Sequence, residues 1–281
     1  MSIKVLTDSS CDLPDEILSR FNIGMVPLRV SFENGETFLD RVELSPAAFM
    51  AKMASFKTLP KTSTPDPAMM MDALAKGLTD YDQVLFISLS SALSCTFQTA
   101  CLGCEMLESD RIRVFDSLTI SLGTGIMVIK AAQMAEQGFN LDEIMEQLAL
   151  IRANSETVFT LDTLDNIVKG GRLKKYEGIT GNLLGIKPIL KPNDLGQVEV
   201  VEKVRGRKKA LNHMLDMIGE YAGESISGRM IGVSHASCLA EAQHLAHAIK
   251  ERYHPREEVI ISEIGATIGT YAGEGGILIS L

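Results

Sequence analysis

The segment VLFISLSSALSCT, residues 84–96, sets the pattern of the first half of the chain. Its apolar run, Val84–Ile87, predicts a buried strand, and the hydroxyl-rich stretch Ser88–Thr96 follows directly. A helix is expected over Ser94–Leu107, because hydroxyls at its start can cap the first turn. A strand, a polar loop and a helix in this order are the repeating unit of a parallel sheet covered by helices.

The same unit recurs on either side of this segment. Further apolar runs are followed by stretches with helical periodicity, and Asn34-Gly35 is a hairpin turn signal. Strands are expected at Ile3–Leu6, Met25–Phe32, Thr37–Leu39 and Ile112–Phe115, and helices at about 15–20, 45–55, 69–78, 119–136 and 141–153. This alternation predicts a doubly wound, mainly parallel sheet, in which ligands bind outside the carboxyl ends of the strands.

The pattern changes near residue 155. Beyond it, two of the expected strands are joined directly by a turn-like segment, Pro192–Gly196. Strands are expected at Val158–Leu161, Ile186–Lys191, Val198–Val204, Met230–Ser234, Val259–Ser262 and Ile277–Ser280, and helices at Lys208–Tyr221 and Leu239–Arg252. We therefore predict an α/β protein of two domains, a doubly wound domain at 1–155 and a mixed α/β domain at 156–281.

Composition and charge narrow the classes of function. The chain has 281 residues, of which 46% are hydrophobic, and a formal net charge of −9. This acidic balance argues against nucleic acid or an anionic membrane as a partner. The five cysteines show no pairing pattern, no apolar run approaches the ~20 residues that span a bilayer, and the N-terminus enters a strand directly. These features predict a cytoplasmic protein.

Two hydroxyl-rich segments, Lys61–Pro67 and Ser88–Thr96, are the main candidates for a binding site. Each precedes a predicted helix, where hydroxyls and free backbone N–H groups can hold a small anionic group. No histidine occurs before residue 213, so these hydroxyls lack a local base that would make one of them a nucleophile. The pattern predicts binding of an anion rather than bond cleavage. The alternative interpretation is that Thr62 and Ser94 are helix-capping or turn residues.

The chain offers little for a metal or a nucleotide. Cys101 and Cys104 fall in the middle of a predicted helix, and small core residues are the simpler interpretation. Asp8, Asp12 and Asp116 lie near predicted strand ends, but no phosphate-binding glycine loop accompanies them. We therefore expect no cofactor, no resident metal, and no binding of ATP or NAD by this chain alone.

Positive charge is concentrated at Lys169–Arg172 and Arg205–Lys209. The first segment is typical of a helix C-terminus, where glycine and cations are favoured. The second opens a predicted helix, where its cations oppose the helix dipole. An anionic ligand or a protein partner would relieve that conflict, and a solvated helix start is the alternative.

Taken in order along the chain, these segments resemble the DegV family of bacterial fatty-acid-binding proteins, which includes the binding subunits of fatty acid kinase. The resemblance covers essentially the whole chain. It rests on seven motifs: Thr7-Asp8-Ser9-Ser10, Lys61-Thr62-Ser63-x-Pro65, Ser91-Ala92-Leu93-Ser94-x-Thr96, Asp116-Ser117, Leu164 through Lys169-Gly170-Gly171-Arg172, Ile186-Lys187-Pro188-Ile189-Leu190, and Ile268-Gly269-Thr270 with Gly273-x-Gly275. The family fold is a two-domain α/β protein, in agreement with the elements predicted above.

The resemblance implies a carrier that holds one long-chain fatty acid and has no catalysis of its own. Thr62 and Ser94 would hydrogen-bond the carboxylate, and Ser63, Arg172 and Tyr271 are possible further head-group contacts. The tail would thread an apolar tunnel in the second domain.

The resemblance also implies partners. A separate ATP-binding subunit of fatty acid kinase would phosphorylate the carboxylate, and an acyltransferase of phospholipid synthesis would receive the acyl-phosphate. Arg205, Arg207 and Lys208 match a region for docking the kinase subunit. Only transient membrane contact is expected.

This chain departs from the family pattern near the expected head-group site. It has Tyr271 where members often have His, Thr64 for a frequent Gln, Cys95 for a frequent Gly, and Glu274 for a frequent Pro. A tyrosine can donate a hydrogen bond to a carboxylate, but it carries no positive charge at neutral pH.

Two other functions stay open. A hydrolase or acyltransferase would use Ser94 or Cys95 as its nucleophile, with His235 arriving from the second domain as the base. A regulatory sensor would close its domains over an acyl ligand. Turnover of an ester or thioester substrate would distinguish the enzyme from a carrier.

Overall fold

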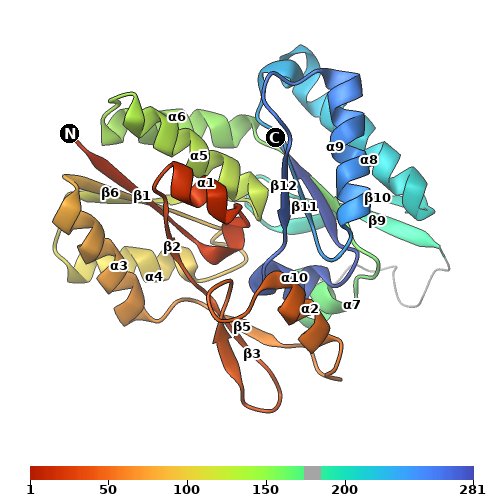
Figure 1. Cartoon of the computed structure of the whole chain (residues 1–281), viewed down its shortest axis with the longest axis horizontal. Helices are drawn as coiled ribbons and strands as arrows, with labels where there is room; N and C mark the ends of the chain where they lie inside the picture. The colour runs from red at the N-terminus through yellow and green to blue at the C-terminus, as the bar shows by residue number, and fades with distance from the viewer. Residues whose placement is uncertain (174–184) are drawn as a thin grey trace.

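The computed structural model describes residues 1–173 and 185–281. Two β-sheets with their helices lie side by side, and a small third sheet lies near the junction between them (Figure 1). The N-terminus lies at the outer end of the first sheet, and the C-terminus lies beside the junction. The structure confirms the predicted class, an α/β protein with one parallel and one mixed sheet.

The first sheet consists of parallel strands in the order β2-β1-β6-β7. They are β1 (Ile3–Asp8), β2 (Gly24–Val26), β6 (Gln83–Ser88) and β7 (Ile112–Asp116). Strand β1 runs from the N-terminus toward the junction, so the carboxyl ends of all its parallel neighbours face the second half of the molecule (Figure 1). The polar loops after β1, β6 and β7 therefore meet at that edge, as the sequence predicts.

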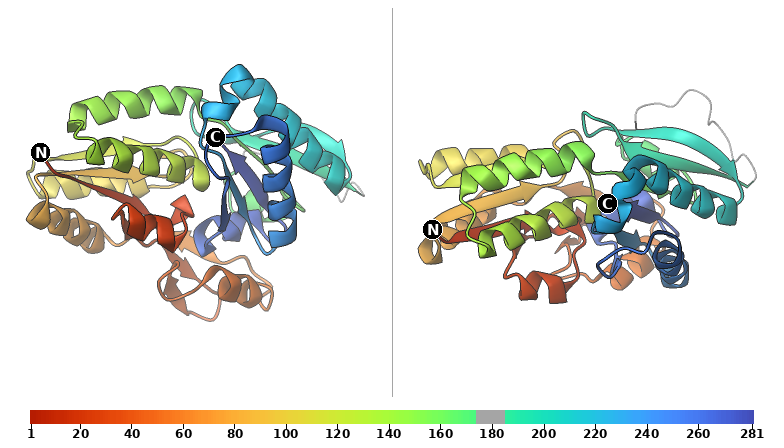
Figure 2. Two further views of the ribbon diagram at one scale, coloured as in Figure 1. Left: turned by 45° about the horizontal axis from the view of Figure 1, so that its top comes forward. Right: turned by 90° about the horizontal axis from the view of Figure 1, so that it is seen from above.

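Helices cover both faces of the first sheet, because its strands are apolar on both sides. In β6, Leu85 and Ile87 pack into the core on one face, and Val84 and Phe86 pack into the core on the other. Figure 2 shows helices on both sides of this sheet. The first face is covered by α1 (Asp15–Arg20), α5 (Leu122–Glu136) and α6 (Leu141–Asn154), and the second by α3 (Pro67–Asp80) and α4 (Thr96–Met106).

The small sheet is antiparallel, with the order β4-β3-β5. It consists of β3 (Arg29–Ser31), β4 (Thr37–Leu39) and β5 (Lys61–Ser63), and α2 (Pro46–Met53) follows β4. Gly35, at φ +86°, lies in the turn of the β3–β4 hairpin, which confirms the turn predicted there. The single strand expected over Met25–Phe32 is wrong: Pro27, which has no backbone N–H, separates β2 in the first sheet from β3 in the small sheet.

The second sheet has the order β10-β9-β8-β13-β11-β12. Its strands are β8 (Thr157–Thr160), β9 (Ile186–Pro192), β10 (Val198–Arg205), β11 (Gly232–His235), β12 (Ile260–Glu263) and β13 (Ile277–Ser280). Neighbouring strands are antiparallel except β11 and β12, which are parallel. A mixed sheet of this kind was predicted for the second half of the chain.

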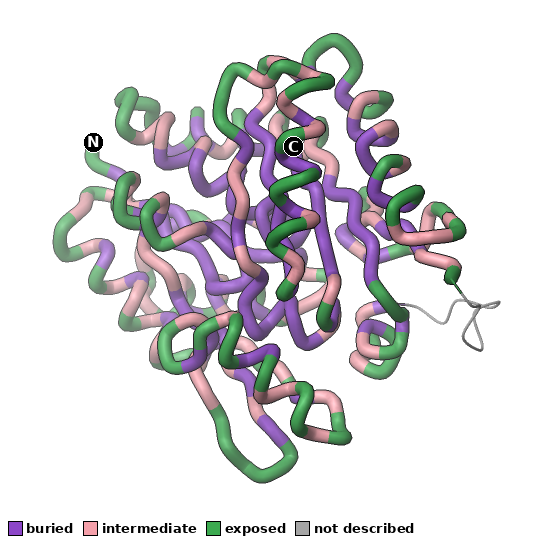
Figure 3. Tube along the Cα trace, turned by 45° about the vertical axis from the view of Figure 1, so that its right-hand side comes forward, coloured by how far each residue is buried: buried purple, intermediate pink, exposed green. Residues whose placement is uncertain are grey.

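One face of the second sheet packs against α8 (Arg207–Ala222) and α9 (Leu239–Tyr253). The other face packs against α7 (Asp165–Lys169), α10 (Ala266–Ala272) and apolar residues of the small sheet and α2. Val30, Phe49, Phe159 and Leu278 belong to one continuous core cluster there. Figure 3 shows buried segments in the interior of both halves.

The chain passes from the first sheet's helices to the second sheet between Asn154 and Thr157. The division into domains at 1–155 and 156–281 remains a prediction, because one apolar core includes residues of both halves. Two short 3-10 helices complete the described elements, η1 (Ser9–Cys11) and η2 (Gly223–Gly228). In the described ranges, no helix combines the length and the apolar character needed to cross a membrane.

Candidate ligand-binding site

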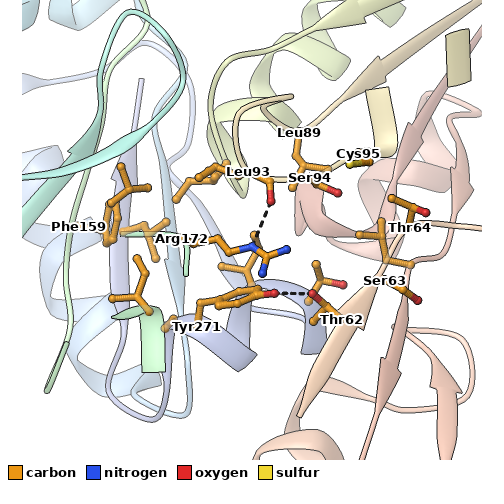
Figure 4. A pocket seen from close by; sticks show the side chains of 18 of the residues that line it. Thr62, Ser63, Thr64, Leu89, Leu93, Ser94, Cys95, Phe159, Arg172 and Tyr271 are labelled. Carbon is orange, nitrogen blue, oxygen red and sulfur yellow. Dashed lines mark hydrogen bonds between the residues drawn. The ribbon is translucent and has the colours of Figure 1, made fainter. Parts of the chain in front are cut away.

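A cavity of about 330 Å³ lies between the two halves, beside the small sheet (Figure 4). This volume lies within the range of small-molecule sites, about 300–1,000 Å³. The cavity is lined from both halves, by Leu28 and Leu93 on one side and by Phe159 and Leu278 on the other. The apolar tunnel was expected within residues 156–281, whereas this cavity also uses residues of the first half.

Thr62 lines the cavity from the edge strand β5, where it pairs with Val30. Its segment, Lys61–Pro67, leads into a helix, as predicted, but α3 begins only at Pro67 and is capped by Asp66, whose carboxylate accepts a hydrogen bond from the Ala68 N–H at 3.0 Å. Helix capping therefore does not explain the Thr62 hydroxyl. Its oxygen instead lies 2.6 Å from the hydroxyl oxygen of Tyr271, across the junction.

Ser94 lies two residues before the first residue of α4, as predicted, and it also lines the cavity. Its Oγ accepts a hydrogen bond from the Thr96 N–H at 3.3 Å and shares another with Thr96 Oγ1 at 2.9 Å. Ser94 thus supports the start of the helix, so the capping interpretation holds in part. The side chain is half-buried at the cavity wall, where a ligand can reach it.

Arg172 brings a positive charge to the cavity. Its guanidinium donates to the Leu93 carbonyl at 3.2 Å and to the Gly170 carbonyl at 2.7 Å, and its Cζ lies 4.9 Å from the centre of the Tyr271 ring. Within residues 1–173 and 185–281, no carboxylate forms an ion pair with it. A half-buried cation held by neutral groups is suited to bind an anion.

Tyr271 lies in the last turn of α10, and its ring packs on Gly170 at the end of α7. A methyl group built on Gly170 would lie 2.5 Å from Tyr271 Cδ1, so only glycine leaves room for the ring. Figure 4 shows the ring between Arg172 and Thr62, with its hydroxyl turned to Thr62. The phenol supplies a neutral hydrogen-bonding group at this position.

The structure thus brings together five sequence-predicted residues at one cavity: Thr62, Ser63, Ser94, Arg172 and Tyr271. Thr64 and Cys95, two of the departures from the family pattern, line the same cavity. Cys95 is exposed and is the residue immediately before α4. The opposite end is apolar and carries Phe159 (Figure 4).

The buried carboxylates of Asp8 and Asp12 accept hydrogen bonds from backbone N–H groups within the protein. Asp8 accepts from the Leu89 N–H at 2.9 Å, and Asp12 accepts from the Gly265 N–H at 2.8 Å. Burial raises the pKa of Asp8 to about 6 and that of Asp12 to about 7. In the described part of the chain, no group of acidic, histidine or cysteine side chains could hold a metal ion.

Three other predicted residues lie outside the cavity. Arg205 and Lys208 are exposed at the junction of β10 and α8. Arg207 is half-buried and turns inward, donating at 2.6 Å both to Glu241 and to the Gly275 carbonyl. The conflict between its charge and the helix dipole is therefore relieved within the protein.

His235 lies at the end of β11 and is not part of the cavity wall. Burial lowers its pKa, and its Nδ1 has no hydrogen-bond partner among the described residues. Ser94 hydrogen-bonds Thr96, and no histidine lines the cavity among the residues that the structure describes. The arrangement of nucleophile and base that a serine or cysteine hydrolase requires is thus not formed here.

Helix α10 and the lining residues Thr267, Ile268 and Ala272 were not predicted from the sequence. The spacing Gly265, Gly269 is the one local signal. A side chain at Gly269 would lie 3.1 Å from the Phe49 ring, which shows that small residues are needed where α10 packs on α2.

Comparisons with known proteins agree with this architecture. A family model described as "Uncharacterised protein, DegV family" matches residues 2–281. A DegV domain-containing protein from Clostridium acetobutylicum is 34% identical over 272 residues, which cover 96% of this chain and 95% of that protein.

Solved structures give the same result. A DegV family protein from Thermus thermophilus, described for its fatty acid binding, is 29% identical, with a TM-score of 0.90 over 100% of this chain and 99% of that one. DegV from Bacillus subtilis, described as a fatty acid binding protein, is 32% identical, with a TM-score of 0.88 over 100% and 98% of the two chains. A Ruminococcus gnavus member, refined with vaccenic acid, is 27% identical and gives a TM-score of 0.91 over 100% of both chains.

Proposed function

The chain belongs to the DegV family, and from this membership we propose that it binds a long-chain fatty acid in the cavity between its halves. One observation carries the proposal: the cavity is apolar at one end, and hydroxyls and a guanidinium gather at the other (Figure 4). This division matches a ligand with an apolar tail and an anionic head. The fatty acids bound by related proteins have that chemistry.

We propose that Thr62 and Ser94 hydrogen-bond the carboxylate and that Arg172 supplies the nearby positive charge. When the carboxylate binds, the Thr62–Tyr271 hydrogen bond at 2.6 Å either breaks or is shared with a carboxylate oxygen. Tyr271 and Ser63 are further possible contacts of the head group. Neutral donors leave one carboxylate oxygen free to react, whereas a fully buried ion pair would hold the head more firmly and hinder transfer.

Most of the affinity would come from the tail. Burying roughly fifteen methylenes at about 0.8 kcal/mol each stabilises the complex by on the order of 10 kcal/mol before the cost of ordering the ligand. The head group then contributes orientation. Hydrogen bonds to a charged group contribute about 1.5–3 kcal/mol each.

We further propose that the protein is a non-catalytic carrier that presents the carboxylate to an ATP-binding kinase subunit, with the acyl-phosphate passing to phospholipid synthesis. Arg205 and Lys208 are exposed and available for docking that subunit, whereas Arg207 is held by Glu241. A cytoplasmic location with only transient membrane contact follows from this role.

Fatty-acid binding is tested with the double variant T62A/S94A. We expect oleate to bind about 100-fold or more weakly, because two hydrogen bonds to the carboxylate are lost. The matched control is T79A/S55A, which removes one exposed threonine hydroxyl and one exposed serine hydroxyl that bond only to their own helix segments.

Displacement of a fluorescent fatty acid gives the affinities, and native mass spectrometry identifies any co-purified acid. Equal affinity of T62A/S94A and the control would contradict the head-group assignment. If the purified protein carries no fatty acid and takes up neither oleate nor palmitate, the proposed function is wrong. Turnover of a p-nitrophenyl or thioester substrate would favour the hydrolase instead.

A further inference from the structure

We propose that Asp40 is a positioning residue for the head-group site and that it acts through helix α10. The inference rests on the proposed function. It starts from an unusual feature of α10: the helix belongs to the last part of the sequence, but groups of the first half hold it at both ends. Asp40 holds the N-terminal end, and Thr62 meets Tyr271 at the other.

The first backbone N–H groups of a helix have no partner within the helix. In α10 and the residue before it, carboxylates of the first half accept hydrogen bonds from three of these groups. The Gly265 N–H donates to Asp12 Oδ1 at 2.8 Å, the Ala266 N–H to Asp40 Oδ1 at 2.7 Å, and the Thr267 N–H to Asp40 Oδ2 at 3.1 Å. The Thr267 hydroxyl adds a bond to Asp40 Oδ2 at 2.6 Å.

Asp40 is itself fixed by the first half. Its carboxylate accepts from Ser9 Oγ at 3.0 Å, its backbone N–H donates to the Leu28 carbonyl at 2.9 Å, and the side chain is fully buried. Gly265 allows the close approach, since a side chain there would lie 2.9 Å from Asp40 Oδ1. The carboxylate therefore connects η1 and the β4–α2 loop to the start of α10.

The far end of the same helix carries the head-group contact. Thr267, Ile268, Tyr271 and Ala272 all line the cavity, and the Tyr271 hydroxyl lies 2.6 Å from Thr62 Oγ1 (Figure 4). Because α10 is less than two turns long from Asp40's contacts to Tyr271, a shift or rotation at its start moves the phenol by a comparable amount. Asp40 touches no ligand in this scheme; it fixes where Tyr271 lies.

The two buried aspartates respond differently to the same substitution. In D40N, the new amide NH₂ must face the backbone N–H of either Ala266 or Thr267. Both groups are hydrogen-bond donors, and a backbone N–H cannot act as an acceptor, so this hydrogen bond is lost. In D12N, the amide oxygen can accept from Gly265 and its NH₂ can donate to Ser121 Oγ, which then donates to Ser234 Oγ. D12N is therefore a matched control at the same helix end.

The test combines oleate affinity with 19F NMR of protein labelled with 3-fluorotyrosine. The chain has five tyrosines, and Y271F identifies the Tyr271 line. We expect D40N to bind oleate about tenfold more weakly, since a buried donor is left unpaired, and to shift the Tyr271 line. D12N keeps both near wild type. The affinity losses of D40N and Y271F are expected to be less than additive in the double variant, because both act on one contact.

An unchanged Tyr271 line in D40N would overturn the proposal, even if affinity or stability falls. Full additivity of D40N and Y271F would do the same. If D40N does not fold, S9A is used in its place, because Ser9 hydrogen-bonds Asp40 and does not line the cavity. We expect S9A to shift the Tyr271 line by a smaller amount. An unshifted line in S9A would contradict the proposal. The NMR readout needs no ligand, so failure of fatty-acid binding and failure of this inference are distinguishable.

Discussion

The contact between Gly170 and Tyr271 gives a sharp test of the head-group geometry. Gly170 has φ −74° and ψ −9°, which an alanine adopts without strain, so the backbone tolerates G170A. The new methyl group, however, would lie 2.5 Å from Tyr271 Cδ1 and 3.1 Å from the Asn166 carbonyl oxygen. The ring must therefore move, but its movement is restricted, because Thr62 hydrogen-bonds its hydroxyl and the Arg172 guanidinium packs on its face.

Several effects set the magnitude of the change in stability. Overpacking costs about 1–3 kcal/mol, and breaking the Thr62–Tyr271 hydrogen bond costs about 0.5–1.5 kcal/mol. Replacing glycine stabilises by about 0.4–1 kcal/mol through the unfolded chain, which offsets part of the loss. We therefore expect G170A to lower the free energy of unfolding by about 1–3 kcal/mol and to weaken oleate binding.

Urea unfolding and displacement of a fluorescent fatty acid measure the two effects. The control is G170A in a Y271A background, where no ring obstructs the methyl group and the substitution should be neutral or slightly stabilising. A coupling free energy of about 1–3 kcal/mol between the two sites is the expected signature. The reasoning is refuted if G170A is as stable as wild type and binds oleate equally well, or if its cost is the same with and without the tyrosine ring.

Two further predictions concern charge. The raised pKa values of Asp12, about 7, and Asp8, about 6, mean that the folded protein retains protons that the unfolded chain releases near pH 4. The contribution of the two protonated carboxyl groups to the free energy of unfolding is complete below about pH 4 and is lost as pH rises through 7. Because D12N cannot ionise at this position, its free energy of unfolding should fall less between pH 5 and 8 than that of wild type. Parallel pH profiles of the two proteins would contradict this prediction. R207A should be destabilised by about 1–3 kcal/mol in urea unfolding, because it leaves Glu241 without its half-buried partner, whereas R205A and K208A should stay within about 0.5 kcal/mol of wild type. If R207A is as stable as wild type, the contacts of Arg207 with Glu241 and Gly275 do not stabilise the fold.

Much of the fold follows from local patterns. The apolar run Val84–Ile87 and its repeats along the first half predict parallel strands between helices, because strands buried on both faces need apolar residues throughout. The motifs at Thr62 and Ser94, and the resemblance that they support, also identified residues that the structure places at one cavity. The loop that carries Ser94 directly follows β6, so neighbouring residues set its position, whereas the position of Thr62 depends on pairing with β3.

Two expectations were wrong, for different physical reasons. Thr62 was expected in a loop before a helix, but it lies on the edge strand β5, which pairs with β3. Met25–Phe32 alternates like one strand, yet Pro27 divides it between two sheets. The first error depends on a strand pairing between segments that are distant in the sequence, whereas Pro27 is a local signal that the alternation around it obscured.

The sequence by itself determined the α/β class, the parallel first sheet, the hydroxyls at its edge and the absence of a local base beside them. Only the tertiary structure decided which distant residues lie beside those hydroxyls. Helix α10 is short, with glycine at both caps, and it is held by Asp40 from 226 residues away and by Thr62 from 209 residues away. Contacts over such separations depend on how two sheets pack, which no local periodicity encodes.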